Sequence, residues 1–356
     1  MNPIIKLVCI FILIFIVSIG LNQLVLKFAS NLGIRGKNNI LSRWNQQQKP
    51  SLGGITLFIS ITLAVFIYLV THSHENVFGQ QVFLMFFLGL LLSFTMGLLD
   101  DAYDTFPFFK LIAQAACGVL IVMSNNTISL TPYFELNAFL TVVWTVGLMN
   151  SINMLDNMDG IAAGTSLSFF MGIFCIDVFV HGSGFTVFHF LLIGFMAALF
   201  GFLWFNKPPS KMFMGDSGSQ LVGYIVAFFS VHMVWDDSSG FTEAFWIKFL
   251  TMSLLLALPL IDTFTVIFNR IKARKSPFKG GKDHTTHHLA YFGYSEKHVF
   301  KFFLVNSAFF SGLGFLTFYL YKKGYYYELL ILFLPLLILF YFLFQKTHLQ
   351  NGRKIP

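Results

Sequence analysis

Long apolar runs separated by short polar segments make up most of the chain. A hydrocarbon core about 30 Å thick needs roughly 20 apolar residues in a helix that rises 1.5 Å per residue. Eleven runs approach that length: 4–24, 54–71, 81–99, 108–124, 137–152, 161–180, 187–205, 218–235, 244–267, 299–320 and 327–345. The pattern predicts an all-α polytopic membrane protein with about 11 transmembrane helices.

The first run is expected to stay in the protein. It is longer than the core of a signal peptide, about 7–15 residues, and no obvious small-x-small cleavage site follows it. The chain is therefore predicted to form a single integral-membrane domain, residues 1–345, and a short cytoplasmic tail, residues 346–356.

Composition agrees with a membrane protein. The chain is 56% hydrophobic and 11% charged, whereas a soluble domain is roughly a quarter charged. Cys9, Cys117 and Cys175 lie inside apolar runs, where cysteine behaves as a small hydrophobe, and none has metal-ligand spacing to another. No disulfide framework is indicated.

The basic residues predict the orientation. With the amino terminus outside, the inner segments hold 19 of the 23 Lys and Arg residues, and only Lys6, Lys248, Lys322 and Lys323 lie elsewhere. The positive-inside rule then makes the amino terminus periplasmic and the carboxyl terminus cytoplasmic, in a multi-pass protein of the cell inner (cytoplasmic) membrane. Because these cations adjoin spans, the +7 formal charge favours membrane lipids and phosphorylated substrates over nucleic acid.

All the distinctive polar motifs fall on the predicted inner face. They are "KPSLGG" at Lys49 to Gly54, "DDAYD" at Asp100 to Asp104, "NSINMLDNMDG" at Asn150 to Gly160, "KMFMGDSGS" at Lys211 to Ser219, and "RIKARKSPFKGGKDHTTHHL" at Arg270 to Leu289. Loop polarity alone does not explain why one face holds all five. We expect an active site at the cytoplasmic face.

Five aspartates stand out in these segments: Asp100, Asp101, Asp156, Asp159 and Asp216. Gathered together, their carboxylates would repel one another unless a cation joined them. Mg²⁺ suits them because it takes hard oxygen ligands and completes its shell with waters and substrate phosphates, and Mn²⁺ is an alternative ion.

Nearby lysines supply the opposite charge. Lys49, Lys110 and Lys211 are placed to meet phosphate oxygens. A simpler reading of the aspartate pair is a hydrated helix end, where the negative charges stabilise the N-terminus of the next helix through its dipole. Asp216 in "GDSGS" is equally consistent with an ordinary helix cap and with a cap whose free N–H groups face a metal-phosphate complex.

The asparagines and aspartates of the third motif share a spacing. Asn150, Asn153, Asp156 and Asp159 are three residues apart and lie on one face if the segment is helical. Asx capping explains one or two such residues, and we favour a site because there are four.

Two further features are ambiguous. Asp262 lies inside the run 244–267, where we expect it to be protonated or paired with a basic loop residue. His284, His287 and His288 have helical spacing, which suits zinc; among so many loop cations, anion binding is the preferred reading.

Together these parts suggest phosphoryl transfer between a soluble donor and a lipid acceptor, in which positioning and charge neutralisation do most of the work. In this order, the motifs from Lys49 to Leu289 resemble those of the polyprenyl-phosphate N-acetylhexosamine-1-phosphate transferases. The resemblance implies an Mg-dependent phosphoglycosyl transferase. Its donor is a UDP-N-acetylhexosamine, its acceptor is undecaprenyl (polyprenyl) phosphate, and the products are UMP and a lipid diphosphate sugar.

The resemblance also implies roles for individual residues. Asp216 matches the family's principal metal aspartate, and Asn153 matches a second ligand or a diphosphate contact. Lys110 matches a lysine that binds the diphosphate, and Lys49 a lysine near the lipid phosphate.

Other motif positions are carried over in the same way. Asp100 and Asp101 match an aspartate pair proposed to orient or deprotonate the acceptor phosphate, and Asp159 falls at the uracil end with Asp156 nearby. The family's histidine motif, which binds the donor, covers the three histidines: His284, His287 and His288.

The sequence departs from the family pattern at two places. Asn157 stands where many members have glycine, and "DHTTHHL" does not reproduce the usual histidine spacing, so the separate roles of the three histidines stay open. The loop looks more like that of the GlcNAc-type or O-antigen-type branch than that of the phospho-N-acetylmuramoyl-pentapeptide branch, which is the alternative. A homodimer is compatible with the sequence, and a lipid- or ion-coupled transporter is a rival of another class.

Overall fold

The computed structural model describes residues 3–31, 49–72, 74–181, 186–235, 245–276 and 281–350, and all regular structure in these ranges is helical. The α-helices are α1 (Pro3–Asn31), α2 (Gly53–Thr71), α3 (Gln81–Tyr103), α4 (Pro107–Met123), α5 (Phe134–Leu155), α6 (Ile161–Ile176), α7 (Val187–Asn206), α8 (Gly215–Ser230), α9 (Phe245–Leu255), α10 (Ala257–Lys272), α11 (Thr285–Tyr291), α12 (Glu296–Lys322) and α13 (Leu334–Gln350). Short 3-10 or π turns occupy Val77–Gly79, Asp177–His181, Val231–Trp235 and Tyr327–Phe333.

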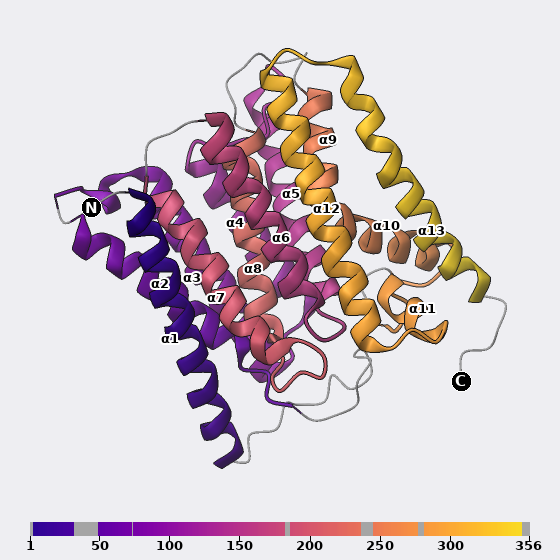
Figure 1. The fold of residues 1–356 in the computed structure, drawn as a ribbon, viewed down its shortest axis with the longest axis horizontal. Helices are drawn as coiled ribbons and strands as arrows, with labels where there is room; N and C mark the ends of the chain where they lie inside the picture. Colours follow the sequence, from indigo (N-terminus) through magenta and orange to yellow (C-terminus); the bar gives the residue numbers. More distant parts are fainter. Residues whose placement is uncertain are drawn as a thin grey trace.

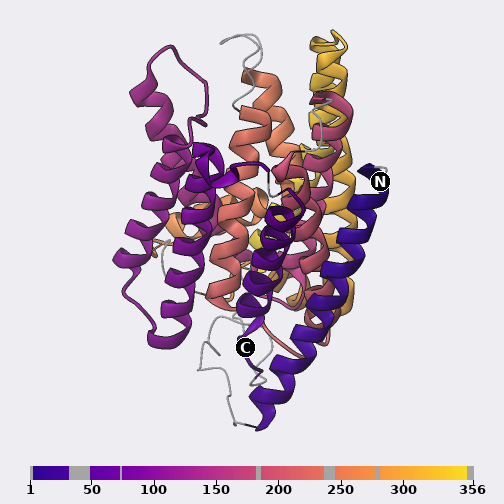
Figure 2. The same ribbon diagram turned by 90° about the vertical axis from the view of Figure 1, so that its left-hand side faces the viewer.

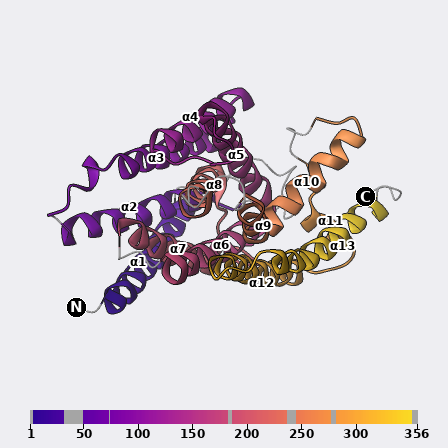
Figure 3. The ribbon, with the colours of Figure 1, turned by 90° about the horizontal axis from the view of Figure 1, so that it is seen from above.

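Helix α8 is the centre of the bundle. In the view from above it lies inside the other helices, with α3, α5 and α2 packed against it (Figure 3). An 18-residue window of the helix from Gly215 to Trp235 is 94% buried. Its polar side chains Ser217, Ser219 and Gln220 are buried, and polar groups within a membrane bundle face other helices and not lipid, which explains this central position.

Most of the predicted spans are confirmed. Among the described residues nine helices are long and apolar enough to cross a membrane, and the chain is a multi-pass membrane protein. These helices run alongside one another in the side view (Figure 2). Helix α4 has 17 residues, fewer than the roughly 20 of a full crossing, so the total of eleven remains a prediction.

The prediction of one helix over 244–267 is wrong. Helices α9 and α10 are separate and meet at an angle of 87°; α10 lies across the direction of its neighbours in Figure 1. Pro259 explains the break, because its ring has no N–H and clashes with the carbonyl of Leu255 in a continuous helix. In the first turn of α10 the same residue causes no loss.

The packing around α8 brings several helix ends to one place. We call the end of the bundle where α3 and α5 finish and α8 begins the site end. A β-carbon on Gly54 would collide with Ser217 and Gly218, and one on Gly97 with the backbone of Asp216. Glycine at both positions therefore allows α2 and α3 to approach the first turn of α8 closely.

The connection before α8 is tied to the start of α2. The N–H groups of Gly53 and Gly54 donate to the carbonyls of Phe213 and Met214 at 3.0 and 2.9 Å, and Phe213 donates to the Pro50 carbonyl at 3.0 Å. These bonds fix the two glycine-containing loops against each other. Of the segments considered above, 32–48, 236–244 and 277–280 lie outside the described residues, as do residues 351–356 of the predicted tail.

Candidate active site

The second aspartate of the pair at the end of α3 is bound to the start of α8. The Asp101 carboxylate accepts hydrogen bonds from the backbone N–H groups of Asp216 and Ser217, each at 2.9 Å and each to a different oxygen. The first N–H groups of a helix have no partner within the helix and carry partial positive charge. Asp101 therefore caps α8 from another helix and fixes the position of Asp216.

The first aspartate of the pair holds a lysine. Asp100 accepts from Lys110 Nζ at 2.9 Å through one oxygen, and from the backbone N–H and hydroxyl of Thr105 at 3.0 and 2.6 Å through the other. Thr105 lies in the turn between α3 and α4. The two adjacent aspartates thus have different partners, which their sequence alone could not distinguish.

Lys110 lies at the middle of the polar cluster at the site end. Besides Asp100, its Nζ is 3.4 Å from Asp216 Oδ1 and 3.5 Å from Asn153 Oδ1. Asn153 in turn donates to Asp216 Oδ1, and to Ser219 Oγ at 2.7 Å. Side chains from α3, α4, α5 and α8 meet here, and Lys110 and Asp216 keep 17% and 20% of their side-chain surfaces exposed, so a ligand can reach them.

A layer of buried amides lies next to this cluster. Gln114 Nε2 donates to Asn150 Oδ1 at 3.2 Å and to Gln220 Oε1 at 3.0 Å, and Asn150 donates back to Gln114 Oε1 at 2.8 Å. The network links α4, α5 and α8 one turn away from Lys110, Asn153 and Asp216. Gln114 and Gln220 were missed by the sequence analysis, although an amide inside an apolar run was the signal that could have found them.

The third motif supplies a second charged pair. Lys49 Nζ lies 3.4 Å from Asp159 Oδ2 and 3.1 Å from Ser210 Oγ, and the Ser210 N–H donates to the same Asp159 oxygen at 2.8 Å. Lys49 and Asp159 are both buried. Gly160 follows with φ at +77°, a backbone conformation that glycine adopts readily, and α6 begins at the next residue.

The expected common face of the third motif is interrupted. Asn150 and Asn153 lie in α5, which ends at Leu155, and Asp156 is its C-cap with an N–H that bonds the carbonyls of Ile152 and Asn153. Asp159 lies in the turn that follows. Its spacing from Asn153 is therefore not helical, and it contacts Lys49 instead of the Lys110 cluster.

The histidine motif is anchored by the aspartate inside the broken run. Asp262 of α10 is 1% exposed and lies 2.8 Å from His284 Nδ1. Its other oxygen accepts from the N–H of Thr285 at 2.8 Å and from the Thr285 hydroxyl at 2.6 Å. The prediction that Asp262 pairs with a basic loop residue is confirmed, and its carboxylate also caps α11.

The same loop contacts the third motif. Thr286 donates to Asn157 Oδ1 at 2.7 Å, which joins α11 to the turn between α5 and α6. Asp283 forms a two-point ion pair with Arg270 at 2.7 and 2.6 Å; burial opposes ionisation, and the guanidinium overcomes it to lower the pKa of Asp283. The histidine motif therefore lies beside the third motif at the site end.

The remaining two histidines are on α11. His287 and His288 are buried, at 0% and 3% exposed. Burial, with the nearby His284, lowers the pKa of His287 to about 3, so its imidazole is neutral at physiological pH. The neutral imidazole packs edge-on against the His284 ring, with the ring centres 5.5 Å apart.

The five aspartates are not gathered around one point. Within the described ranges no group of three or more His, Cys, Asp or Glu side chains is arranged to hold a metal ion. Asp159 is paired with Lys49, Asp101 caps α8, Asp156 is the C-cap of α5, and Asp100 and Asp216 share Lys110 as a partner. The single acidic cluster expected from sequence is therefore divided.

The donors present still fit Mg²⁺. This ion is commonly held by one or two carboxylates, with waters and substrate phosphates completing the shell. Asp216 offers a partly exposed carboxylate, and Asn153 lies against it with an amide that presents its oxygen if it turns over. These two side chains are the candidate ligands.

Comparison with known sequences finds a family model that matches the central part of the chain. The sequence model of glycosyl transferase family 4 matches residues 83–234, from α3 to the turn after α8. This part of the chain, less than half of its 356 residues, is therefore similar to glycosyl transferase family 4. The match includes the Lys110 cluster and Asp159, whereas Lys49 and the three histidines lie outside it.

Relatives extend the similarity beyond the part matched by the family 4 model. The chain is 29% identical over 257 residues to the probable undecaprenyl-phosphate N-acetylglucosaminyl 1-phosphate transferase of Bacillus subtilis, covering 70% of this chain and 67% of that protein. It is 26% identical over 311 residues to the undecaprenyl-phosphate alpha-N-acetylglucosaminyl 1-phosphate transferase of Escherichia coli O157:H7, covering 82% and 79%. It is also 34% identical over 201 residues to the phospho-N-acetylmuramoyl-pentapeptide-transferase of Leuconostoc mesenteroides, covering 51% and 61%.

Proposed function

We propose that this protein transfers a sugar-1-phosphate, GlcNAc-1-phosphate or that of a related N-acetylhexosamine, from a UDP-sugar to undecaprenyl phosphate. UMP leaves and undecaprenyl-diphosphate-sugar forms, which is the initiating step of cell-envelope polysaccharide synthesis. The observation that carries the proposal is Lys110, held by Asp100, Asp216 and Asn153 in a partly exposed cluster where four helices end. The activities after which the Bacillus subtilis and Escherichia coli relatives are named support it.

The cluster suits phosphoryl transfer because this reaction depends mainly on positioning and on neutralising phosphate charge. Lys110 supplies a cation that its neighbours hold in one place, and it contacts the donor diphosphate. Asp216 and Asn153 would hold Mg²⁺, which neutralises charge on the diphosphate when bound. Asp101 keeps Asp216 in position through the first turn of α8.

The acceptor needs no strong base in this scheme. The second pKa of a phosphate monoester is near 6, so an undecaprenyl phosphate is mostly ionised at neutral pH. Asp100 is bound on both oxygens, by Lys110 and by Thr105, which suits a residue that orients Lys110. The acceptor oxygen attacks the phosphorus bonded to the sugar, and the bond from that phosphorus to the UMP oxygen breaks.

The donor is proposed to extend toward the histidine motif. Asp159 and Lys49 form a buried pair in the neighbouring turn, and α11 adjoins that turn through Asn157 and Thr286. Donor binding therefore involves α11, which Asp262 holds at its start. The site end is proposed to face the cytoplasm in the inner membrane, with eleven crossings and the amino terminus in the periplasm, because the basic loops lie on that side.

A panel of donors tests the proposal. Purified protein with Mg²⁺ and undecaprenyl phosphate is given UDP-GlcNAc, UDP-GalNAc or UDP-N-acetylmuramoyl-pentapeptide, and UMP release is followed. We expect release with an N-acetylhexosamine donor and none with the pentapeptide donor. Release with the pentapeptide alone would establish the alternative suggested by the Leuconostoc relative, and no release from a folded preparation would reject the enzyme.

Two variants make the test specific to the site. Asp216→Ala is expected to abolish release, because the cluster loses its exposed carboxylate. Asp104→Asn is the control: Asp104 belongs to the "DDAYD" motif at the site end, is exposed, and has a φ of 55° that asparagine tolerates. Equal activity of the two variants would place the reaction elsewhere.

A further inference from the structure

An apolar pocket lies at the site end, on the side of α11 away from the Lys110 cluster. Its volume is about 230 Å³, and its lining comes from α11, α12, α13 and the loop before α12: Leu289, Tyr294, His298, Val299, Phe302 and Phe342. An apolar cavity of roughly 150 Å³ already stays dry and holds a benzene-sized molecule. This pocket therefore has room for a segment of hydrocarbon chain.

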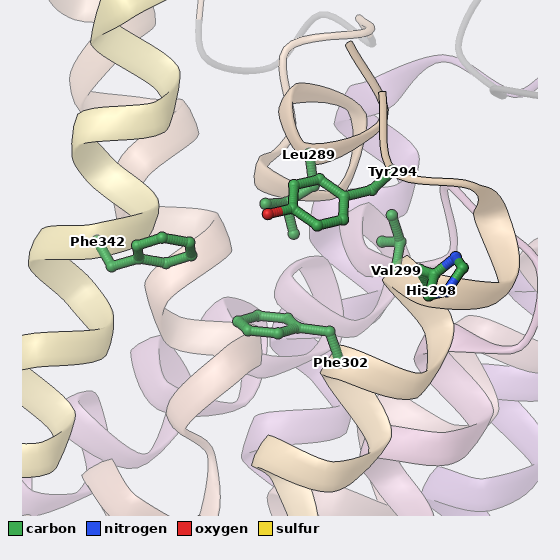
Figure 4. Close-up of a pocket in the computed structure, with 6 residues that line it drawn as sticks. All are labelled: Leu289, Tyr294, His298, Val299, Phe302 and Phe342. Atoms are coloured by element: carbon green, nitrogen blue, oxygen red, sulfur yellow. The ribbon is translucent and has the colours of Figure 1, made fainter. Parts of the chain in front are cut away.

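Polar groups lie at the border of this apolar pocket. In the close-up, Phe342 on α13 faces Phe302 on α12 across the opening, and the hydroxyl of Tyr294 points toward Phe342 (Figure 4). Lys346 adds a cation at this border, with Nζ 5.6 Å from the Phe342 ring centre and 4.4 Å from that of Phe292. The apolar interior thus has a basic group beside it.

Apolar side chains continue from the pocket along one face of α12 and one face of α13. On α13, Ile338, Phe342 and Lys346 are four residues apart and share a face that reads apolar, apolar, basic toward the site end. On α12, Phe302 and the exposed Val305 are three residues apart and therefore lie on the same face of the helix. Exposed apolar side chains that lead to a cation match a lipid tail that leads to its headgroup.

We propose that this pocket binds a phospholipid with an anionic headgroup, one acyl chain lying against Phe302 and Phe342 and the phosphate meeting Lys346. Charge complementarity selects this occupant: Lys346 lies beside Phe342 at the border, and Lys301 follows the lining residue His298 by three residues on α12. The pocket is separate from the Lys110 cluster, so the phospholipid is a structural or regulatory ligand and takes no part in phosphate transfer. This inference does not depend on the proposed function.

Native mass spectrometry of the full-length protein in detergent tests it, with dioleoyl phosphatidylglycerol and dioleoyl phosphatidylcholine as probes. The wild type is expected to bind phosphatidylglycerol about fivefold more tightly, since one basic residue near an anionic lipid contributes on that order. Lys346→Gln removes this preference. Lys323→Gln keeps it, although Lys323 also lies over a ring, at 5.6 Å from the centre of Tyr319.

A second pair of variants tests the chain site. Phe342→Ala weakens the binding of both lipids by roughly three- to tenfold and keeps the preference between them, because it removes a lining ring. Phe340→Ala is its matched control, since the two rings are 36% and 37% exposed on the same helix and Phe340 does not line the pocket. Equal effects of the two variants would overturn the proposal.

Two further outcomes would also overturn it. The first is equal binding of the two phospholipids by the wild type. The second is displacement of bound phosphatidylglycerol by undecaprenyl phosphate in wild type and not in Phe342→Ala, which would assign the pocket to the acceptor lipid. Neither measurement uses a donor or turnover, so failure here and failure of the proposed enzyme activity are distinguishable.

Discussion

Asp101→Ala is expected to impair the protein by releasing the start of α8. In the native structure the two carboxylate oxygens of Asp101 accept the N–H groups of Asp216 and Ser217, both at 2.9 Å. Alanine leaves these two donors without their acceptor. Asp216 lies on the turn that is released, so a change at Asp101 reaches the Lys110 cluster without any direct contact between Asp101 and substrate.

The size of the effect follows from the number and kind of bonds lost. A hydrogen bond to a charged group contributes about 1.5–3 kcal/mol, and water at this partly open site replaces some of it. We expect a local loss of about 2–4 kcal/mol for the two bonds of Asp101. Since every 1.4 kcal/mol corresponds to a factor of ten, kcat/KM falls by about 30-fold or more.

Asp101→Asn separates anchoring from proton transfer. Its amide keeps one acceptor oxygen, so about half of the interaction, about 1–2 kcal/mol, is lost and kcat/KM falls by about five- to thirtyfold. A residue that must accept a proton would instead lose nearly all activity as asparagine. The alanine variant is also expected to lower the melting temperature by roughly 3–8 °C, with the asparagine variant in between.

The assay measures UMP release and thermal unfolding on the same purified preparations, with Asp104→Asn as the control. The interpretation is refuted if Asp101→Ala keeps the wild-type melting temperature and loses all activity. It is also refuted if Asp101→Asn is as inactive as Asp101→Ala. Either result would give Asp101 a direct role in the reaction, which is the role that its match to the family's aspartate pair implies.

Three other substitutions test the surroundings of the site. Gly97→Ala places a β-carbon against the backbone of Asp216 and is expected to reduce kcat/KM at least about tenfold, whereas Gly147→Ala, with open space around it, leaves it unchanged. Asp262→Asn weakens the cap of α11, so KM for the UDP-sugar rises more than kcat falls; a change in kcat alone would contradict this. Burial lowers the pKa of His287 to about 3, and unfolding restores it to about 6.5, so stability is complete above pH 6.5 and about 2 kcal/mol lower at pH 5. His287→Gln should remove that acid-dependent fall in melting temperature, and an equal fall in both proteins would argue against it.

The apolar pattern predicted most of the helices, and the polar segments between the runs indicated which residues would come together at one end of the bundle. Runs of apolar residues correspond to helices because a lipid-exposed backbone has no other way to pair its polar groups. The break in the run 244–267 had a visible cause in Pro259, but a run counted by hydrophobicity alone ignores it. The ring and missing N–H of Pro259, and not the average hydrophobicity of the run, determined where the helix breaks.

The pairing of the charged residues could not be predicted from the chain. Asp100 and Asp101 are adjacent and identical in type, yet helical rotation turns one toward Lys110 and the other toward the first turn of α8. Asp159 was expected to share a helix face with Asn153, but α5 ends at Leu155, so the two residues do not lie on one helix. Such partners come from distant helices, and only their packing brings them together.

The fate of the donor's two phosphates tests the central claim most directly. UDP-GlcNAc labelled on the phosphate bonded to the sugar is incubated with Mg²⁺, undecaprenyl phosphate and the purified protein, and the label is located by mass spectrometry or counting. The account predicts label in the lipid product, none in the released UMP, and none in the lipid with Asp216→Ala. Label released as UDP, or an unchanged lipid product with Asp216→Ala, would contradict phosphosugar transfer at this cluster.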